Sequence, residues 1–495
     1  MGRSEAIARH FSAGWPAPRV DTMASNKLAR RSVFSVIFIF ATLVAAFPQD
    51  IPKREFISYA AARPVVAAFA DSLPAELKPA SSLDAAKWSA WVQKADREVR
   101  DRLNKGEEDT LTNLLRFGVT FTKEYRIDDD YLARYGSSSL VDSFAENRAN
   151  DLIRALSKPD SWTQNSSEGM ERMRAFLTKK GFSLKTPEQR KRVKKYLLDN
   201  LARMRDDVQR YRAPANEATR AQLFKDRGIS LDTNLWPDFL LDQHFRRMVE
   251  KGMLKPGSVT KIAIVGPGLD FANKEKGNDF YPPQTIQPFA VVDSLVRLGV
   301  AKGDTVELYT LDISSEVNYH VAGARKNAIA GHAYTIQLPW NTVARHTPEY
   351  RKNFVEYWQR LGDQIGEPVK PIEAPDSVQG AVTDMQTRAV KIRPGIVRRV
   401  QPLDMNIVYQ REPLPAQQGF DLIIGTNIFI YYDAFEQSLA RANIATMLKP
   451  GGFLLSNDKF PDTVPSGLAN ALDTTLLVAR DPERTDTMYC YRKEK

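Results

Sequence analysis

Apolar residues in the C-terminal half of the chain gather in short runs that end at glycine, proline or an acid. The run at 262–265 stops at a Gly-Pro-Gly turn, 266–268, and Asp270 follows that turn. Similar runs occur at 306–311, 420–424 and 453–456. Such runs are typical of buried strands. Glycine after a strand lets a ligand approach the backbone, so the pattern predicts a ligand site at the strand ends.

Helical patterns separate these apolar runs. They cover residues 284–298, 315–330 and 434–447, and two further strand-like runs lie at 474–479 and 487–492. Strands that alternate with helices imply a parallel sheet with right-handed crossovers. The last two runs are separated by a short polar segment, which predicts an antiparallel hairpin. The expected fold class is therefore α/β, with a mostly parallel sheet and a terminal antiparallel hairpin.

The N-terminal half has a mainly helical pattern and shows no catalytic constellation. Its clearest helix start is at Thr186, where Pro187 takes the first helical position and Gln189 stands three residues after the cap. We expect an α-helical domain over residues 55–250. The sheet domain is expected over residues 256–495.

A basic and then apolar segment near the N-terminus is typical of a targeting sequence. Lys27, Arg30 and Arg31 precede residues 32–47, which carry no charge. This stretch is shorter than the ~20 residues of a membrane span. Small residues around Ala46 fit a cleaved secretory signal, so residues 1–47 are predicted to be a signal peptide. The alternative is an uncleaved anchor that associates with the membrane through residues 32–47. Either would make the protein exported or membrane-anchored.

The composition argues against several kinds of partner and site but does not indicate a function. The chain has 70 Lys and Arg against 60 Asp and Glu, a formal charge of +10. No segment concentrates this excess as a nucleic-acid-binding module does, so no nucleic-acid partner is predicted. The single cysteine excludes an intrachain disulfide. Five histidines without an HxxxH pair give no support for a metal site, so no metal is predicted.

Four motifs in the C-terminal half occur in an order that resembles a known family. They are IVGPGLD at 264–270, LDIS at 311–314, FDLIIGTNIFIYYD at 420–433 and MLKPGGFLLSND at 447–458. With the terminal hairpin, they resemble the class I S-adenosylmethionine (SAM) methyltransferases. The last two motifs look closest to the chemotaxis-receptor glutamate methyltransferases. The helical N-terminal half does not resemble the receptor-docking part of that family, so receptor methylation is not implied.

The resemblance implies a Rossmann-like class I methyltransferase sheet, preceded by the α-helical domain, with SAM as the cofactor. The residues that it assigns to cofactor binding are Gly266, Gly268, Asp270, Asp312, Ile313, Asp404, Asn406, Ile407, Thr426 and Asn427. The glycines would admit the cofactor next to the backbone. Asp312 would accept the ribose hydroxyls, and residues 404–407 would contact the adenine. Thr426 and Asn427 would face the cofactor or the methyl acceptor.

Each polar residue in this set also has an ordinary structural interpretation. Asp312 could cap the following helix, a role that is compatible with ribose binding. Asp404 and Asn406 could stabilise a loop, and Asn427 could cap a strand. No catalytic residue is assigned, because a sulfonium methyl donor needs mainly alignment and desolvation. The acceptor, a carboxylate or another oxygen or nitrogen nucleophile, is not identified by the sequence.

Three further residues are candidates for an acceptor pocket, although packing in the core or at the surface is the more common role for each of them taken singly. They are Tyr281, Gln284 and Tyr431.

Three features depart from the family pattern. The family has an acid where this chain has Ile264, and residues 271–283 lengthen the segment after the glycine turn. The leader would also direct the protein away from the cytoplasm, where SAM is made. A non-catalytic, exported binding or scaffold protein with a methyltransferase-like fold is therefore the alternative. A nicotinamide or flavin enzyme is disfavoured, because Phe271 stands where that fingerprint has its last glycine.

Overall fold

The computed structural model places Pro52–Lys495 in one compact unit. It describes residues 54–135, 139–162, 167–213, 223, 228–231, 235–270, 279–341, 346–373, 385–461, 467–480 and 483–494. The leader predicted at 1–47 lies outside these residues. Within the described ranges, no helix combines the length and the apolar character that crossing a bilayer requires.

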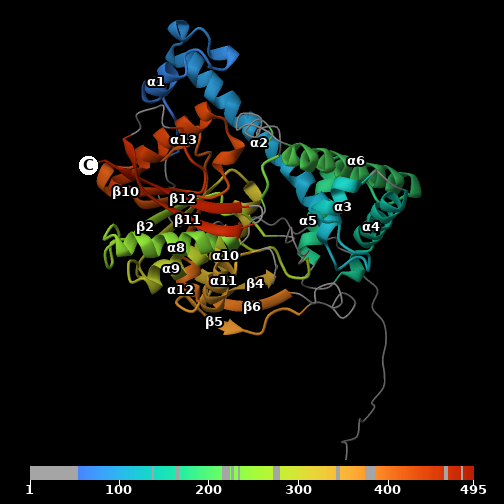
Figure 1. Ribbon diagram of the computed structural model, residues 1–495. Helices are drawn as coiled ribbons and strands as arrows, with labels where there is room; N and C mark the ends of the chain where they lie inside the picture. Colours follow the sequence, from blue (N-terminus) through green and yellow to red (C-terminus); the bar gives the residue numbers. More distant parts are fainter. Residues whose placement is uncertain are drawn as a thin grey trace, which may run out of the picture. The chain divides into compact units, whose positions relative to one another are not determined.

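A seven-stranded, mostly parallel sheet forms the centre of this unit (Figure 1). Its strand order is β11-β12-β10-β9-β2-β3-β7. The bounds are β2 Lys261–Val265, β3 Glu307–Asp312, β7 Val400–Asp404, β9 Phe420–Gly425, β10 Leu448–Ser456, β11 Leu468–Arg480 and β12 Glu483–Lys493. Only β12 runs antiparallel to its two neighbours, β10 and β11. The predicted α/β class and terminal hairpin are confirmed, and the sheet is consistent with a Rossmann-like methyltransferase fold.

Both faces of the central strand β2 are buried, which explains its uninterrupted apolar sequence. Ile262 and Ile264 face a core that is shared with α8, α9 and α10, whereas Ala263 and Val265 face a core that is shared with α13. The bounds of these helices are α8 Leu235–Glu250, α9 Gln287–Arg297, α10 Ser315–Ile329 and α13 Ala434–Met447. Figure 1 accordingly shows α13 on one side of the sheet and α8 and α9 on the other.

A small antiparallel sheet interrupts the alternation of strands and helices after α10. It has the order β4-β6-β5, with bounds β4 Tyr334–Asn341, β5 Gly366–Val369 and β6 Met385–Ile392. The helix α11, Pro348–Arg360, lies between β4 and β5 in the chain, and α12, Pro394–Val397, follows β6. A further pair of short strands, β1 Glu55–Phe56 and β8 Gln410–Arg411, joins the two halves of the chain. The sequence pattern did not predict the small sheet β4-β6-β5.

The N-terminal half is helical, as expected. Its principal helices are α1 Tyr59–Ala68, α2 Ala85–Phe117, α3 Asp129–Arg134, α4 Ser139–Ser157, α5 Ser167–Lys179 and α6 Pro187–Arg212. The helix start predicted at Thr186 is confirmed, because Thr186 and Gln189 form a reciprocal capping box.

The longest of these helices, α2, belongs to two hydrophobic cores. Its first half packs Trp88 and Val92 into the core beneath the sheet and α13, and its last turns pack Leu114 into a core with α4, α5 and α6. The division into a helical domain and a sheet domain stays a prediction. The core around Leu114 lies within the helical half, whereas the core around Trp88 and Val92 also includes residues of the sheet.

Two glycines, Gly106 and Gly228, let α2 pack directly against the segment 228–231. A Cβ atom on Gly106 would lie 1.8 Å from the carbonyl oxygen of Ile229, and one on Gly228 would lie 2.2 Å from the nitrogen of Gly106. These distances leave no room for any other residue type at either position.

We predict that Gly106→Ala destabilises the fold although alanine favours helices. The methyl group must push the segment 228–231 away from α2, and overpacking of this kind lowers the free energy of unfolding by about 1–3 kcal/mol. The matched control is Gly323→Ala in α10, where a Cβ atom would have no neighbouring atom within 4 Å. This control should raise the free energy of unfolding by about 0.5–1 kcal/mol. Urea unfolding of both variants tests the prediction, and a stabilising Gly106→Ala would contradict it.

Candidate functional site

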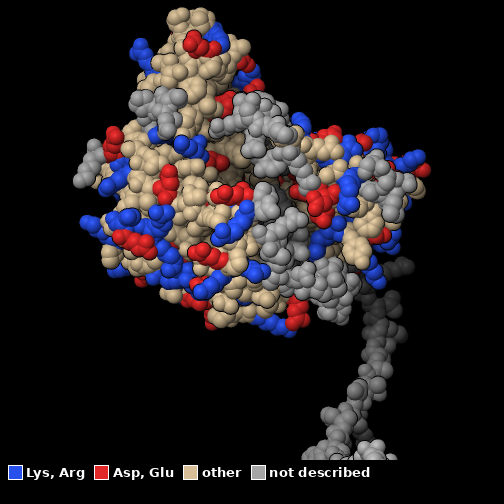
Figure 2. Space-filling model, in the orientation of Figure 1, with Lys and Arg blue, Asp and Glu red and all other residues tan. Residues whose placement is uncertain are grey.

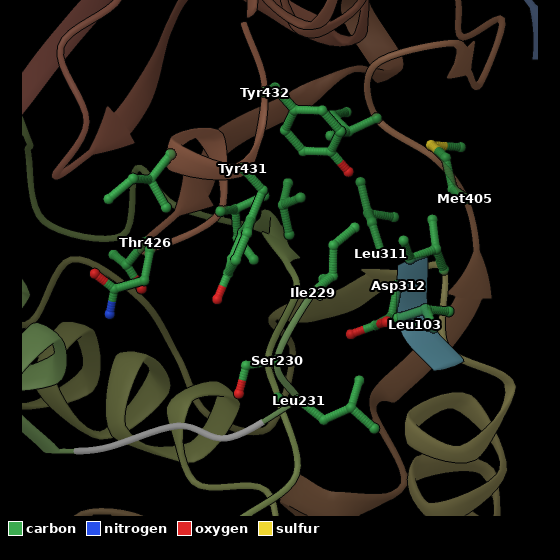
Figure 3. Close-up of a pocket in the computed structure, with 18 of the residues that line it drawn as sticks. Leu103, Ile229, Ser230, Leu231, Leu311, Asp312, Met405, Thr426, Tyr431 and Tyr432 are labelled. Carbon is green, nitrogen blue, oxygen red and sulfur yellow. The ribbon is translucent and has the colours of Figure 1, made fainter. Parts of the chain in front are cut away.

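A cavity of about 260 Å³ opens where the carboxyl ends of β2, β3 and β9 meet (Figure 3). The central strand β2 has β3 on one side and β9 on the other, so the strand order reverses at this point. In open parallel sheets, ligands bind outside the strand ends at such a switch point. We call it the strand-end cavity. Of the residues predicted from the sequence, it is lined by Gly266, Gly268, Asp312, Ile313, Ile407, Thr426 and Asn427.

The glycine turn after β2 requires glycine for two reasons. Gly266 and Gly268 have φ angles of +61° and +74°, which side chains disfavour. A Cβ atom on Gly266 would also lie 2.2 Å from Cδ1 of Ile428, which lines the same cavity. The turn therefore brings the backbone to the cavity wall and leaves room for a neighbouring side chain.

Asp312 ends β3 and presents a buried carboxyl group at the cavity wall. Its Oδ1 accepts a hydrogen bond from the backbone N–H of Ser314 at 2.7 Å. Burial raises the pKa of Asp312 to about 7, with a smaller contribution in the same direction from Asp404. The N-cap of α10 is Ser314, whose hydroxyl accepts from the Val317 N–H, so Asp312 is not the capping residue. No described side chain donates a hydrogen bond to this carboxylate.

The loop after β9 is held by two residues at the end of β10. Asn427 has a φ of +58°, and its side chain and backbone exchange hydrogen bonds of 2.7 Å with Asn457. Asp458 accepts the backbone N–H groups of Phe429 and Ile430 at 3.0 and 3.2 Å. Asn427 thus has the structural role that the sequence left open, while it also lines the cavity.

Three of the predicted cofactor-binding residues lie outside the cavity lining. The carboxylate of Asp404 pairs with Arg100 at 2.8 Å, although Asp404 is the register partner of Asp312. The amide of Asn406 donates to Asp96 at 2.8 Å, and its Oδ1 accepts from the backbone of Val408. These contacts correspond to the loop-stabilising alternative.

Asp270 instead organises the start of the inserted segment. Its Oδ2 accepts from the hydroxyl of Tyr281 at 3.0 Å and from the amide of Gln284 at 3.2 Å. Neither Tyr281 nor Gln284 lines the strand-end cavity, whereas Tyr431 does. Within the insertion, residues 271–278 lie outside the described part of the chain. Asp279, which follows them, accepts the backbone N–H groups of Val119 and Thr120.

One wall of the cavity comes from the N-terminal half, which the sequence did not indicate. Leu103 on α2 and the residues Ile229, Ser230 and Leu231 line it. The backbone N–H of Ile229 donates to Arg102 O at 3.3 Å, and Leu269 N donates to Leu231 O at 2.7 Å. This segment therefore joins α2 to the glycine loop. The only sequence signal was the pair of glycines at 106 and 228, which are too far apart in the chain to be linked without a structure.

A second cavity, of about 630 Å³, lies beside α5 and α10 and shares no lining residue with the first. Its main polar groups already have partners. Arg172 pairs with Glu107 and Glu316 at 2.6 and 2.7 Å, and His320 contacts the Tyr334 hydroxyl at 2.8 Å. The strand-end cavity is therefore the better candidate for a functional site.

The visible face of the molecule shows no large area of a single charge sign (Figure 2). On the face that Figure 2 shows, Lys and Arg side chains are interspersed with Asp and Glu. This mixture agrees with the even distribution of charge along the sequence. The absence of a nucleic-acid partner stays a prediction.

No protein-family model and no curated protein matches this chain. Among solved structures, the N-methyltransferase NodS from Bradyrhizobium japonicum WM9, in complex with S-adenosyl-L-homocysteine, is 12% identical, with a TM-score of 0.24; the match covers 56% of this chain and 99% of NodS. Magnesium protoporphyrin IX methyltransferase (ChlM) from Synechocystis PCC 6803 is 10% identical, with a TM-score of 0.23; the match covers 58% of this chain and 93% of ChlM. TM-scores this low carry no weight here, and the fold assignment rests on the strand order.

We predict that Asp458→Ala loosens the loop that forms one side of the cavity. Two partly buried backbone N–H groups would lose their shared acceptor, Oδ2, which should lower the free energy of unfolding by roughly 1–3 kcal/mol. The control Asp458→Asn keeps one acceptor oxygen and should lose less. Urea unfolding measures both, and equal losses in the two variants would contradict the role of the carboxylate.

Proposed function

We propose that this protein is a SAM-dependent methyltransferase whose cofactor lies in the strand-end cavity. The observation that carries the proposal is the meeting of the glycine turn, Asp312 and Thr426 at one switch point, in one cavity. These residues come from three separate motifs, more than forty residues apart in each case. A glycine turn beside a carboxylate suits a ligand that carries a ribose.

The chemical groups in the cavity fit this cofactor. The ribose of SAM carries two hydroxyl groups, and the Asp312 carboxylate has no side-chain donor among the described residues. Met405 and Ile407 are buried apolar residues that can contact the flat adenine. Gly266 and Gly268 give the amino-acid end access to the backbone. The three functional parts of the ligand thus each have a counterpart.

SAM supplies, when bound, a methyl group on a sulfonium that is already strongly electrophilic. The contribution of the chain is then to align the reactants and to exclude water. Ile229 and Leu231 present apolar side chains to the cavity, which favours exclusion of water. A carboxylate acceptor needs no general base, whereas a hydroxyl or amine acceptor does. We assign no catalytic residue, and the acceptor stays a carboxylate or another oxygen or nitrogen nucleophile.

The alternative is a non-catalytic binding or scaffold protein on the same fold. Ile264 at the position of the family's acid and the predicted leader both favour it. Ligand binding distinguishes the two, because a scaffold has no reason to retain an affinity for the cofactor.

We predict that Asp312→Asn weakens the binding of S-adenosylhomocysteine to the full chain by at least about tenfold, because hydrogen bonds to charged groups contribute roughly 1.5–3 kcal/mol. The matched control is Asp404→Asn, on the neighbouring strand and in register with Asp312 but outside the cavity. This control should change the affinity by less than about twofold. Isothermal titration calorimetry measures both variants.

Two results would count against the proposal. If the unsubstituted chain fails to bind S-adenosylhomocysteine at millimolar concentration, the scaffold alternative is favoured. If Asp404→Asn weakens binding as much as Asp312→Asn, the effect comes from the strand ends as a whole and Asp312 has no special role.

The raised pKa of Asp312 predicts that affinity depends on pH. Ribose hydroxyls donate to the ionised carboxylate, so binding of S-adenosylhomocysteine should strengthen by up to about tenfold between about pH 6 and pH 8. The stability of the protein without ligand should change in the opposite direction as the pH rises. The folded state holds this proton more tightly than the unfolded state, so Asp312 lowers stability as the pH rises from about 4 to about 7. Asp312→Asn should reduce both dependences, as calorimetry and thermal unfolding can measure.

A further inference from the structure

The strand-end cavity lacks a carboxylate at the position that the resembling family uses. Ile264 is fully buried, in the core that β2 shares with α8 and α9. A ligand with a free amino group would therefore need another acceptor in this cavity. The buried carboxylate of Asp238 does not line the cavity, but it is hydrogen-bonded to Gln287, which does.

Gln287, the first residue of α9, lines the cavity with its amide in a fixed orientation. Its Nε2 donates to Oδ1 of Asp238 at 3.0 Å and to the hydroxyl oxygen of Thr426 at 2.9 Å. An amide nitrogen has two hydrogens, so both are used. The remaining group, Oε1, accepts no hydrogen bond from the described residues. Gln287 lines the cavity, so a ligand there can supply the donor that Oε1 lacks.

Asp238, on α8, provides the negative charge behind this amide. It is 2% exposed, and its second oxygen, Oδ2, has no hydrogen-bond partner among the described residues. Burial raises the pKa of Asp238 to about 7, and the bond from Gln287 opposes this shift. The nearby Tyr357 hydroxyl also has no hydrogen-bond partner in this part of the chain. Among the described residues the carboxylate thus has a single hydrogen-bond donor, the Gln287 amide, and a cation on the far side of that amide would add a favourable charge.

We propose that Gln287 is the acceptor for the α-ammonium group of the cofactor and that Asp238 is the residue that positions it. This inference rests on the proposed function and adds a subsite to it. Above about pH 7 the Asp238 carboxylate is mostly ionised and accepts hydrogen bonds only, so it holds the Nε2 side of the amide and leaves Oε1 for a donor in the cavity. The same charge offsets the positive end of the α9 dipole, which would otherwise repel an ammonium group.

The test compares two ligands that differ in the amino acid alone. S-adenosylhomocysteine carries the α-ammonium group, whereas 5′-methylthioadenosine has the adenosine and the sulfur without it. Titration calorimetry on the full chain gives both affinities. In Gln287→Leu, S-adenosylhomocysteine should bind at least about tenfold more weakly, while the affinity for methylthioadenosine should stay within about twofold. Binding of methylthioadenosine also reports that the variant is folded.

A charge-exchange variant provides the matched control. Asp238→Asn combined with Gln287→Glu keeps one carboxylate and one amide but moves the carboxylate to the cavity wall. This double variant should keep the preference for S-adenosylhomocysteine, because the ammonium group again meets an acceptor. If Gln287 instead served the ligand's carboxylate, the double variant would lose that preference, and the inference would be overturned.

Failure of this inference differs from failure of the proposed function. Equal weakening of both ligands in Gln287→Leu, or no change in either, would overturn the inference alone. If the unsubstituted chain binds neither ligand, the proposed function is overturned and the inference falls with it.

Discussion

The burial of β2 on both faces is the constraint on which the rest of the molecule depends. A five-residue strand has no polar face to give to water, so helices must cover both sides. With β3 on one side and β9 on the other, the turns after all three strands open at the same edge. The cavity exists because these turns diverge there, and its polar groups are the ones that the strand ends can present.

The fold could be predicted from the sequence because its signals are local. Apolar runs of strand length, the capping residues at Thr186 and the polar break before the terminal hairpin each act over a few neighbours. The three-stranded sheet β4-β6-β5 was missed for the same reason. Its strands are separated by a helix and by long segments, and Pro339 and Pro368 lie within two of them. Pairing at such distances leaves little trace in a single sequence.

The candidate site was predictable only in part. Residues directly after a strand, such as Asp312 and Thr426, take their places from the sheet itself. Asp404 has an equivalent position, but Arg100 on α2 draws its carboxylate away from the cavity. The wall formed by Ile229 and Leu231 depends on contacts between distant segments. Gln287 looked like an ordinary helix residue, because the hydrogen bonds that orient it come from α8 and from Thr426, the residue after β9.

The membership of α2 in two cores has a consequence for the dynamics of the site. A helix of 33 residues is a rod about 50 Å long, and this one carries Leu103 at the cavity wall between its two packed ends. Local unfolding of the central turns of α2 would remove Leu103 from the cavity wall. The wall can therefore persist only as long as these turns stay helical, which amide hydrogen exchange measures.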